Sequence, residues 1–336
     1  MARKCDCSQN QEVRIWFPKP LGDDVVRDLQ ALVPGHPVSK EPSHDTEMLI
    51  EGRPQREQLE ACPNLRWVVV PFAGVPTTTI KLLADFPNAS LHNLHHNAPQ
   101  TAETALTLLL AAAKQTVPVD QSLRRNDWSP RYSPSQAILL EGKTALILGH
   151  GEVGQRVGAV LRAMGMAVLT IRRNPTCPEE FGPNQLMELL QRANVLIIAV
   201  PHTSETEGMI GPAQITAMPR GSILVNVARA QVVDEQALFD ALKSGHLHSA
   251  GLDVWYRYPQ EEGGAVPGYF VAPPSAKNTA PANLPFGEIE TLVMSPHRGG
   301  ATAGTETQRV EHLARLIEAA SSGVPVPNKV RMDLGY

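Results

Sequence analysis

The stretch TALILGHGEVG, residues 144–154, decides the fold of the chain. Its first five residues are an apolar run typical of a buried strand, and three glycines follow at the start of a helical pattern. In such a turn the first glycine permits the tight bend, the second admits a pyrophosphate, and the third lets helix and strand pack closely. The stretch predicts a dinucleotide site, the alternative being a glycine-rich turn without a ligand. The expected cofactor contacts here are Gly149, His150, Gly151, Glu152, Val153 and Gly154.

Short apolar runs continue after this turn and alternate with stretches of helical period. Because the runs are apolar on both faces, they are typical of a parallel sheet that helices cover on both sides. Apolar residues at Val153, Val157, Val160, Leu161 and Met164 indicate a helix between the first two runs. The fold class is therefore α/β, with a Rossmann-type doubly wound parallel sheet. The six runs are residues 144–148, 167–171, 195–200, 222–227, 249–254 and 291–296.

The first hundred residues repeat the alternation on a smaller scale and predict a smaller, flavodoxin-like α/β substrate domain. A helix at 101–115 would link the two domains, and a final helix at 305–320 would pack back on the first domain. That final helix would bury Val310, Leu313, Leu316 and Ile317. We expect residues 1–96 and 302–336 to form the substrate (catalytic) domain and residues 97–301 the dinucleotide-binding domain. The apolar runs of the smaller domain are 12–17, 47–50, 65–71 and 90–94, with helices from about Asp23 and Thr77.

Two proline-rich stretches interrupt this pattern. Residues 117–142 surround Trp128 with three prolines and predict an irregular connection, used as an arm in a homodimer. Residues 259–290 predict a long loop, and loops of that length beside a strand end are often functional.

Composition excludes several classes of function. The chain has 336 residues, 30 Lys and Arg, 34 Asp and Glu, and a formal net charge of −4, which argues against nucleic-acid binding and a polybasic membrane anchor. No apolar run reaches the ~18 residues of a spanning helix, and the N-terminus lacks the apolar core of a signal peptide, so we expect a cytoplasmic protein. The four cysteines, Cys5, Cys7, Cys62 and Cys177, are too few and scattered for a disulfide framework or a paired zinc motif, and we predict no metal.

The end of the second apolar run indicates which cofactor is preferred. An acidic residue there would bind the ribose hydroxyls of NAD, but the chain has Arg172, Arg173 and Asn174. Guanidinium groups form charge-assisted hydrogen bonds to a 2′-phosphate, whereas a carboxylate would repel it. We therefore expect NADP(H) to be preferred over NAD(H). The alternative is that these arginines stack on adenine or face solvent.

Four motifs in a fixed order reveal a resemblance to a known family. They are GHGEVG (149–154), VNVARAQVVDE (225–235), GLDVW (251–255) and SPHRGG (295–300). In this combination the chain resembles the D-isomer-specific 2-hydroxyacid dehydrogenases, the family of glyoxylate and hydroxypyruvate reductases, from roughly residue 60 to the C-terminus.

The resemblance implies a role for each matching residue. Arg229 would bind the substrate carboxylate and polarise the carbonyl, although Ala230 follows it where the family usually has glycine. His297 would be the general acid and base. The alternatives are a surface ion pair for Arg229 and a structural role for His297. Further cofactor contacts are expected at Pro201, Val227, Ala228 and, near the nicotinamide, Asp253, and substrate contacts at Ala73, Gly74, Val75 and Asn97.

The family's usual catalytic glutamate is replaced by Tyr258, five residues beyond Asp253. The glutamate raises the pKa of the catalytic histidine, which a neutral phenol cannot do. Three interpretations remain open. The carboxylate of Glu261 or Glu262 contacts His297 in place of the missing glutamate, or His297 works without a carboxylate and has a lower pKa. The third is that the substrate is not an ordinary 2-oxo acid.

We therefore expect an NADPH-preferring reductase that converts small 2-oxo acids, of the glyoxylate and hydroxypyruvate kind, to D-2-hydroxy acids. One alternative is a formate-dehydrogenase-like oxidation, because that subfamily has a neutral glutamine at the position of Tyr258. The other is a nucleotide-sensing binding protein of the same fold without turnover.

Overall fold

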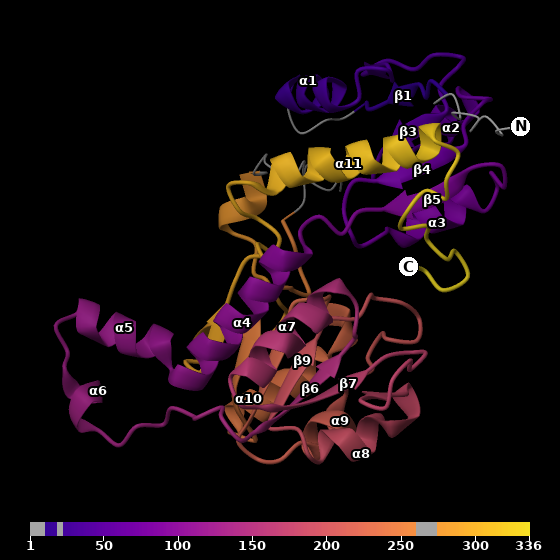
Figure 1. Ribbon diagram of the computed structural model, residues 1–336. Helices are drawn as coiled ribbons and strands as arrows, with labels where there is room; N and C mark the ends of the chain where they lie inside the picture. Colours follow the sequence, from indigo (N-terminus) through magenta and orange to yellow (C-terminus); the bar gives the residue numbers. More distant parts are fainter. Residues whose placement is uncertain (1–10, 19–22, 260–273) are drawn as a thin grey trace, which may run out of the picture. The chain divides into compact units, whose positions relative to one another are not determined.

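A computed structural model describes residues 11–18, 23–259 and 274–336. The chain divides into two compact units (Figure 1). The first contains the described residues between 11 and 97 together with residues 302–336, and the second contains the described residues between Ala98 and Ala301. Asn97 is thus the last residue of the N-terminal part of the first unit.

The second unit is built on a seven-stranded sheet with the order β12-β11-β10-β9-β6-β7-β8, in which every neighbouring pair is parallel. β6 (Thr144–Leu148) lies between β7 and β9, so the strand order reverses beside it. This reversal defines the doubly wound sheet that the glycine-rich stretch predicted. The other strands are β7 (Ala167–Ile171), β8 (Glu180–Phe181), β9 (Val195–Ile198), β10 (Ser222–Asn226), β11 (Leu247–Leu252) and β12 (Leu292–Met294).

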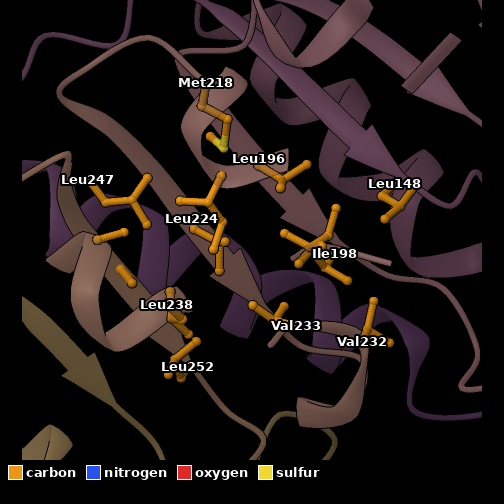
Figure 2. Packing of buried hydrophobic residues seen from close by; sticks show 14 of the residues in the cluster. Leu148, Leu196, Ile198, Met218, Leu224, Val232, Val233, Leu238, Leu247 and Leu252 are labelled. Carbon is orange, nitrogen blue, oxygen red and sulfur yellow. The ribbon is translucent and has the colours of Figure 1, made fainter. Parts of the chain in front are cut away.

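Helices cover both faces of this sheet because side chains of successive strand residues point to opposite sides. Ala145 and Ile147 pack with α4 and α7, whereas Leu146 and Leu148 belong to a core shared with α8, α9 and α10. Figure 2 shows this second core, where Leu224 and Leu238 belong to the same cluster. The helices are α4 (Ala98–Lys114), α7 (Glu152–Ala163), α8 (Leu186–Leu190), α9 (Pro212–Ala217) and α10 (Glu235–Lys243).

The first unit has a five-stranded parallel sheet of order β2-β1-β3-β4-β5. The C-terminal helix α11 (Thr305–Ser321) packs with α1 against one face of it, as predicted, and buries Val310, Leu313, Leu316 and Ile317 (Figure 1). The other elements are β1 (Ile15–Trp16), α1 (Asp23–Leu32), β2 (Val38–Ser39), β3 (Met48–Ile50), α2 (Arg56–Glu60), β4 (Trp67–Val70), α3 (Thr77–Leu83) and β5 (Ser90–Asn93).

Some details differ from the sequence-based expectations. The stretch 117–142 is not wholly irregular, because α5 (Thr116–Arg124) begins just before it and continues into it, and α6 (Ser129–Tyr132) lies within it. Prolines are compatible with these helices, since Pro118 and Pro130 fall in the first turn of each. Val160, one of the apolar residues that indicated α7, is 42% exposed. The short edge strand β8 was not predicted.

The described residues contain no helix that combines the length and the apolarity needed to cross a bilayer.

Candidate active site

The glycine-rich turn between β6 and α7 has the geometry of a phosphate-binding turn. Gly149 has φ +102°, and a Cβ there would lie 2.5 Å from the Ala199 carbonyl oxygen. At Gly154 a Cβ would lie 2.0 Å from the Gly149 oxygen, so both positions require glycine. Around Gly151, by contrast, no described residue other than its chain neighbours has an atom within 4 Å of a Cβ position. The turn is therefore closed on the protein side and open at the N-terminus of α7, which fits the pyrophosphate of a dinucleotide.

Arg172 and Arg173 follow β7, and both already have carboxylate partners. Arg172 Nη1 lies 3.1 Å from Glu180 Oε1, and Arg173 forms an ion pair with Glu205. Glu180 also accepts a hydrogen bond from the ring of His150, at 2.5 Å. Its side chain is only 2% exposed, and the bond from His150, followed by those from Thr176 and Arg172, holds the pKa of the Glu180 carboxyl far below its usual range. The sequence indicated the two arginines but missed Glu180.

Arg229 lies in the turn that follows β10. The buried Asn226 side chain shapes this turn, because its Nδ2 donates to the Arg229 carbonyl at 3.0 Å and its Oδ1 accepts from the Ala228 N–H at 3.0 Å. Arg229 Nη1 donates to its neighbour's carbonyl oxygen, at 2.7 Å. The guanidinium group is half-buried at the carboxyl end of the sheet. Asn226 was not singled out from the sequence, although a polar residue ending a buried strand is a usable signal.

Asp253, directly after β11, holds the turn that carries His297. Its buried carboxylate accepts from Ser295 Oγ at 2.5 Å and from the N–H groups of Arg298 and Gly299, both at 2.8 Å. His297 itself has φ +56°, a left-handed conformation that few side chains adopt without support. The three hydrogen bonds on either side of it supply that support. The carboxylate of Asp253 thus accepts its hydrogen bonds from the turn that carries His297.

His297 is in contact with Tyr258. The phenol oxygen lies 2.9 Å from His297 Nδ1 and accepts a hydrogen bond from the Trp255 N–H at 3.1 Å. The phenol can accept from Trp255 and donate its own proton to Nδ1, and in that arrangement the ring proton of a neutral His297 is on Nε2. Burial raises the pKa of Tyr258, so the phenol stays protonated at neutral pH.

The surroundings of His297 lower its pKa. Burial contributes most, the positive charge of Arg229 adds to it, and the negative charge of Asp253 opposes it. The neutral imidazole is therefore favoured. Glu261 and Glu262, which could supply a carboxylate, lie outside the described residues.

The remaining expected site residues are placed as follows. Pro201 follows β9, and its carbonyl oxygen accepts from Thr206 Oγ1 at 2.7 Å. Val227 and Ala228 are buried between β10 and Arg229. Ala73, Gly74, Val75 and Asn97 belong to the first unit, where Asn93 Nδ2 donates to the Ala73 carbonyl at 2.7 Å.

The histidines near β5 have partners within the first unit. The His92 ring bonds Ser90 Oγ and the Pro327 carbonyl oxygen, and His96 Nε2 accepts from Arg309 at 3.4 Å. In the parts of the chain that the structure describes, no three His, Cys, Asp or Glu side chains are grouped to hold a metal ion.

Comparison with known proteins agrees with this geometry. Residues 106–299, which contain the glycine-rich turn, Arg229, Asp253 and His297, match the family described as D-isomer specific 2-hydroxyacid dehydrogenase, NAD binding domain. A glyoxylate reductase from Thermococcus kodakarensis is 30% identical over 343 residues, covering 96% of this chain and 91% of the relative.

Two solved structures have a similar fold. One is a D-isomer specific 2-hydroxyacid dehydrogenase from Xanthobacter autotrophicus Py2 in complex with NADPH and MES, with TM-score 0.77, 23% identity, and coverage of 97% of this chain and all of that one. The other is an acyclic imino acid reductase in complex with NADPH and D-arginine, with TM-score 0.74, 19% identity, and coverage of 95% of this chain and all of that one.

The fold and the site define an oxidoreductase of the Rossmann class that uses a nicotinamide cofactor. More narrowly, the chain belongs to the D-isomer specific 2-hydroxyacid dehydrogenase family.

The contacts of Asp253 predict how a substitution there acts. In Asp253→Asn the amide N–H₂ faces backbone donors, so the His297 turn loses charge-assisted bonds worth about 1.5–3 kcal/mol each. We expect kcat to fall roughly tenfold or more, since about 1.4 kcal/mol of lost transition-state stabilisation corresponds to a factor of ten. NADPH affinity, measured by fluorescence titration, should stay nearly unchanged. Ser295→Ala, which removes one donor and leaves the carboxylate, should have a smaller effect. A loss of NADPH affinity with an intact kcat would instead place Asp253 at the cofactor.

Proposed function

We propose that the protein is an NADPH-preferring reductase of small 2-oxo acids, such as glyoxylate and hydroxypyruvate, and that it forms D-2-hydroxy acids. The observation that carries the proposal is the position of Arg229 and His297. Both follow strands of the sheet that bears the glycine-rich turn, at the carboxyl edge where such sheets bind their ligands. The glyoxylate reductase relative supports the same substrate class.

Each residue has a defined task in this reaction. A bound nicotinamide cofactor supplies the hydride. Arg229 binds the substrate carboxylate with its planar fork and draws electron density from the carbonyl. His297 holds the proton at Nε2 that the product oxygen receives. Further substrate contacts are proposed at the backbone of Ala73, Gly74 and Val75 and at Asn97.

The proposal is tested by NADPH oxidation with a panel of 2-oxo acids, accompanied by fluorescence titration of NADPH and NADH. We expect turnover with small 2-oxo acids and tighter binding of NADPH. Arg229→Lys keeps the charge but loses the fork, so kcat/KM should fall while NADPH affinity hardly changes. Nucleotide binding without turnover of any 2-oxo acid would favour a sensing protein, and turnover with formate alone would favour a formate-dehydrogenase-like oxidation.

A 2-imino acid is a second candidate substrate, and the Tyr258–His297 contact favours it. A carbonyl needs a hydride and a proton, and a neutral His297 gives up a proton reluctantly. An iminium carbon takes only the hydride, because its nitrogen already carries the proton. Adding ammonia or methylamine to the 2-oxo acid assay tests this candidate. A faster NADPH oxidation that yields a D-amino acid would support it, and an unchanged rate would eliminate it.

The arm formed by α5 and α6 is proposed to hold two copies of the chain together as a homodimer. None of the residues of α5 is buried within the described part of the chain, and Trp128 and Tyr132 are 60% and 81% exposed. Val119, Leu123 and Leu139 extend this exposed apolar surface. Apolar patches of this kind mark protein interfaces.

Sedimentation equilibrium tests the dimer. We expect the wild type to have twice the mass of the chain and Leu123→Ser/Trp128→Ser to shift towards the monomer. Met187→Ser, which changes a 40% exposed apolar residue on α8, should leave the mass unchanged. A monomeric wild type at micromolar concentration would refute the assignment.

The lowered pKa of His297 predicts the pH dependence of reduction. The rate depends on the protonated imidazole, so a lower pKa makes kcat/KM fall from a more acidic pH as the pH rises. Tyr258→Glu places a negative charge beside Nδ1, which raises the pKa and should move the limb to higher pH. Tyr258→Phe adds no charge and should move it little. If kcat/KM of Tyr258→Glu falls over the same pH range as that of the wild type, Tyr258 does not control the proton on His297.

A further inference from the structure

The carboxylate of Glu180 is the centre of a buried polar cluster beside the glycine-rich turn. Oε1 accepts from His150 Nδ1 at 2.5 Å and from Arg172 Nη1 at 3.1 Å. Oε2 accepts from the Thr176 N–H at 2.6 Å and from Thr176 Oγ1 at 2.9 Å. A carboxylate has about four acceptor positions, and protein donors occupy all of them here.

This cluster joins three segments that are apart in the sequence. His150 belongs to the glycine-rich turn after β6, Arg172 follows β7 directly, and Glu180 begins the short strand β8. β8 pairs in parallel with β7, with Thr170 opposite Glu180. This pairing places the carboxylate next to the glycine-rich turn, where it contacts His150. In a doubly wound sheet the adenosine ribose lies at this place, between the glycine-rich turn and the end of the second strand.

We propose that Glu180 is a positioning residue that determines cofactor selectivity, by holding Arg172 and His150 ready to bind a 2′-phosphate. The inference rests on the dinucleotide site described under the proposed function. Arg172 uses Nη1 on Glu180 and Thr176 and, among the described residues, keeps Nε and Nη2 for the ligand. His150 adds an Nε2–H donor when its ring is protonated, because Nδ1 already donates to Glu180. A guanidinium fixed at one end binds phosphate with less loss of side-chain freedom than a free one.

A carboxylate at this place could also act in the opposite sense, by accepting hydrogen bonds from ribose hydroxyls and repelling a phosphate, as in NAD-selective sites. The contacts argue against that role. The Glu180 side chain is 2% exposed, its acceptor positions are filled, and the positive charge of Arg172 lies 3.1 Å away. Its negative charge is therefore compensated by protein groups and is not directed at the ligand.

The experiment uses two adenosine fragments as probes, 2′,5′-ADP and ADP, titrated calorimetrically into the full-length protein. Neither probe requires the nicotinamide or substrate site, so the result is independent of catalysis. We expect wild type to bind 2′,5′-ADP more tightly. In Glu180→Gln the affinity for 2′,5′-ADP should fall roughly fivefold or more, while that for ADP stays within about twofold.

Three controls make the result specific. Glu179→Gln makes the same charge change at the exposed neighbouring residue and should alter neither affinity. Glu180→Asp keeps the charge, should lose less, and serves if Glu180→Gln does not fold. In an Arg172→Ala background, Glu180→Gln should add little further loss, because a residue that acts through another is not additive with it.

Four outcomes would overturn the inference. Tighter binding of 2′,5′-ADP by Glu180→Gln would mean that the carboxylate repels the phosphate. An equal loss for both probes would mean that Glu180 only maintains the whole nucleotide site. Equal binding of both probes by wild type would remove the selectivity but keep the site, and binding of neither would refute the dinucleotide site itself.

Discussion

The parallel pairing of β6 with β7 on one side and β9 on the other is the constraint on which the second unit depends. Parallel strands end at the same edge of a sheet, so the glycine-rich turn, the Arg172 segment, the Arg229 turn and the His297 turn all leave the sheet on that edge. The strand order reverses beside β6. The connections that follow β6 and β9 therefore run in opposite directions from this edge, and the space between them is available to a ligand. Chemistry and nucleotide recognition are therefore consequences of one pairing pattern.

Much of this fold follows from local signals in the sequence. Runs that are apolar on both faces predicted six strands of the larger sheet, and the close contacts at Gly149 and Gly154 explain why glycine marks the turn. The two-residue strand β8 gave no such signal, because Glu180 and Phe181 are too few to show a period. The helices α5 and α6 were missed because prolines that suit a first turn were read as signs of irregular structure.

The candidate site was predictable in its parts but not in its connections. Motifs pointed to Arg229 and His297, and the spacing from Asp253 pointed to Tyr258, whose phenol does contact His297. The partners that orient these groups come from other segments: Ser295 on Asp253, Trp255 on Tyr258, and Asn226 on the Arg229 turn. Such contacts depend on side-chain directions at strand ends, and a linear pattern of residue types does not encode them.

The place of α11 in the first unit has a consequence for how the protein is made. The helix is near the end of the chain, yet it shares a hydrophobic core with α1 and with strands from the first seventy residues. On a ribosome those early residues emerge long before the helix that completes their core. The second unit, whose sequence lies between, is then the first that can finish folding, and part of the apolar surface of the N-terminal segment stays uncovered until α11 has been made.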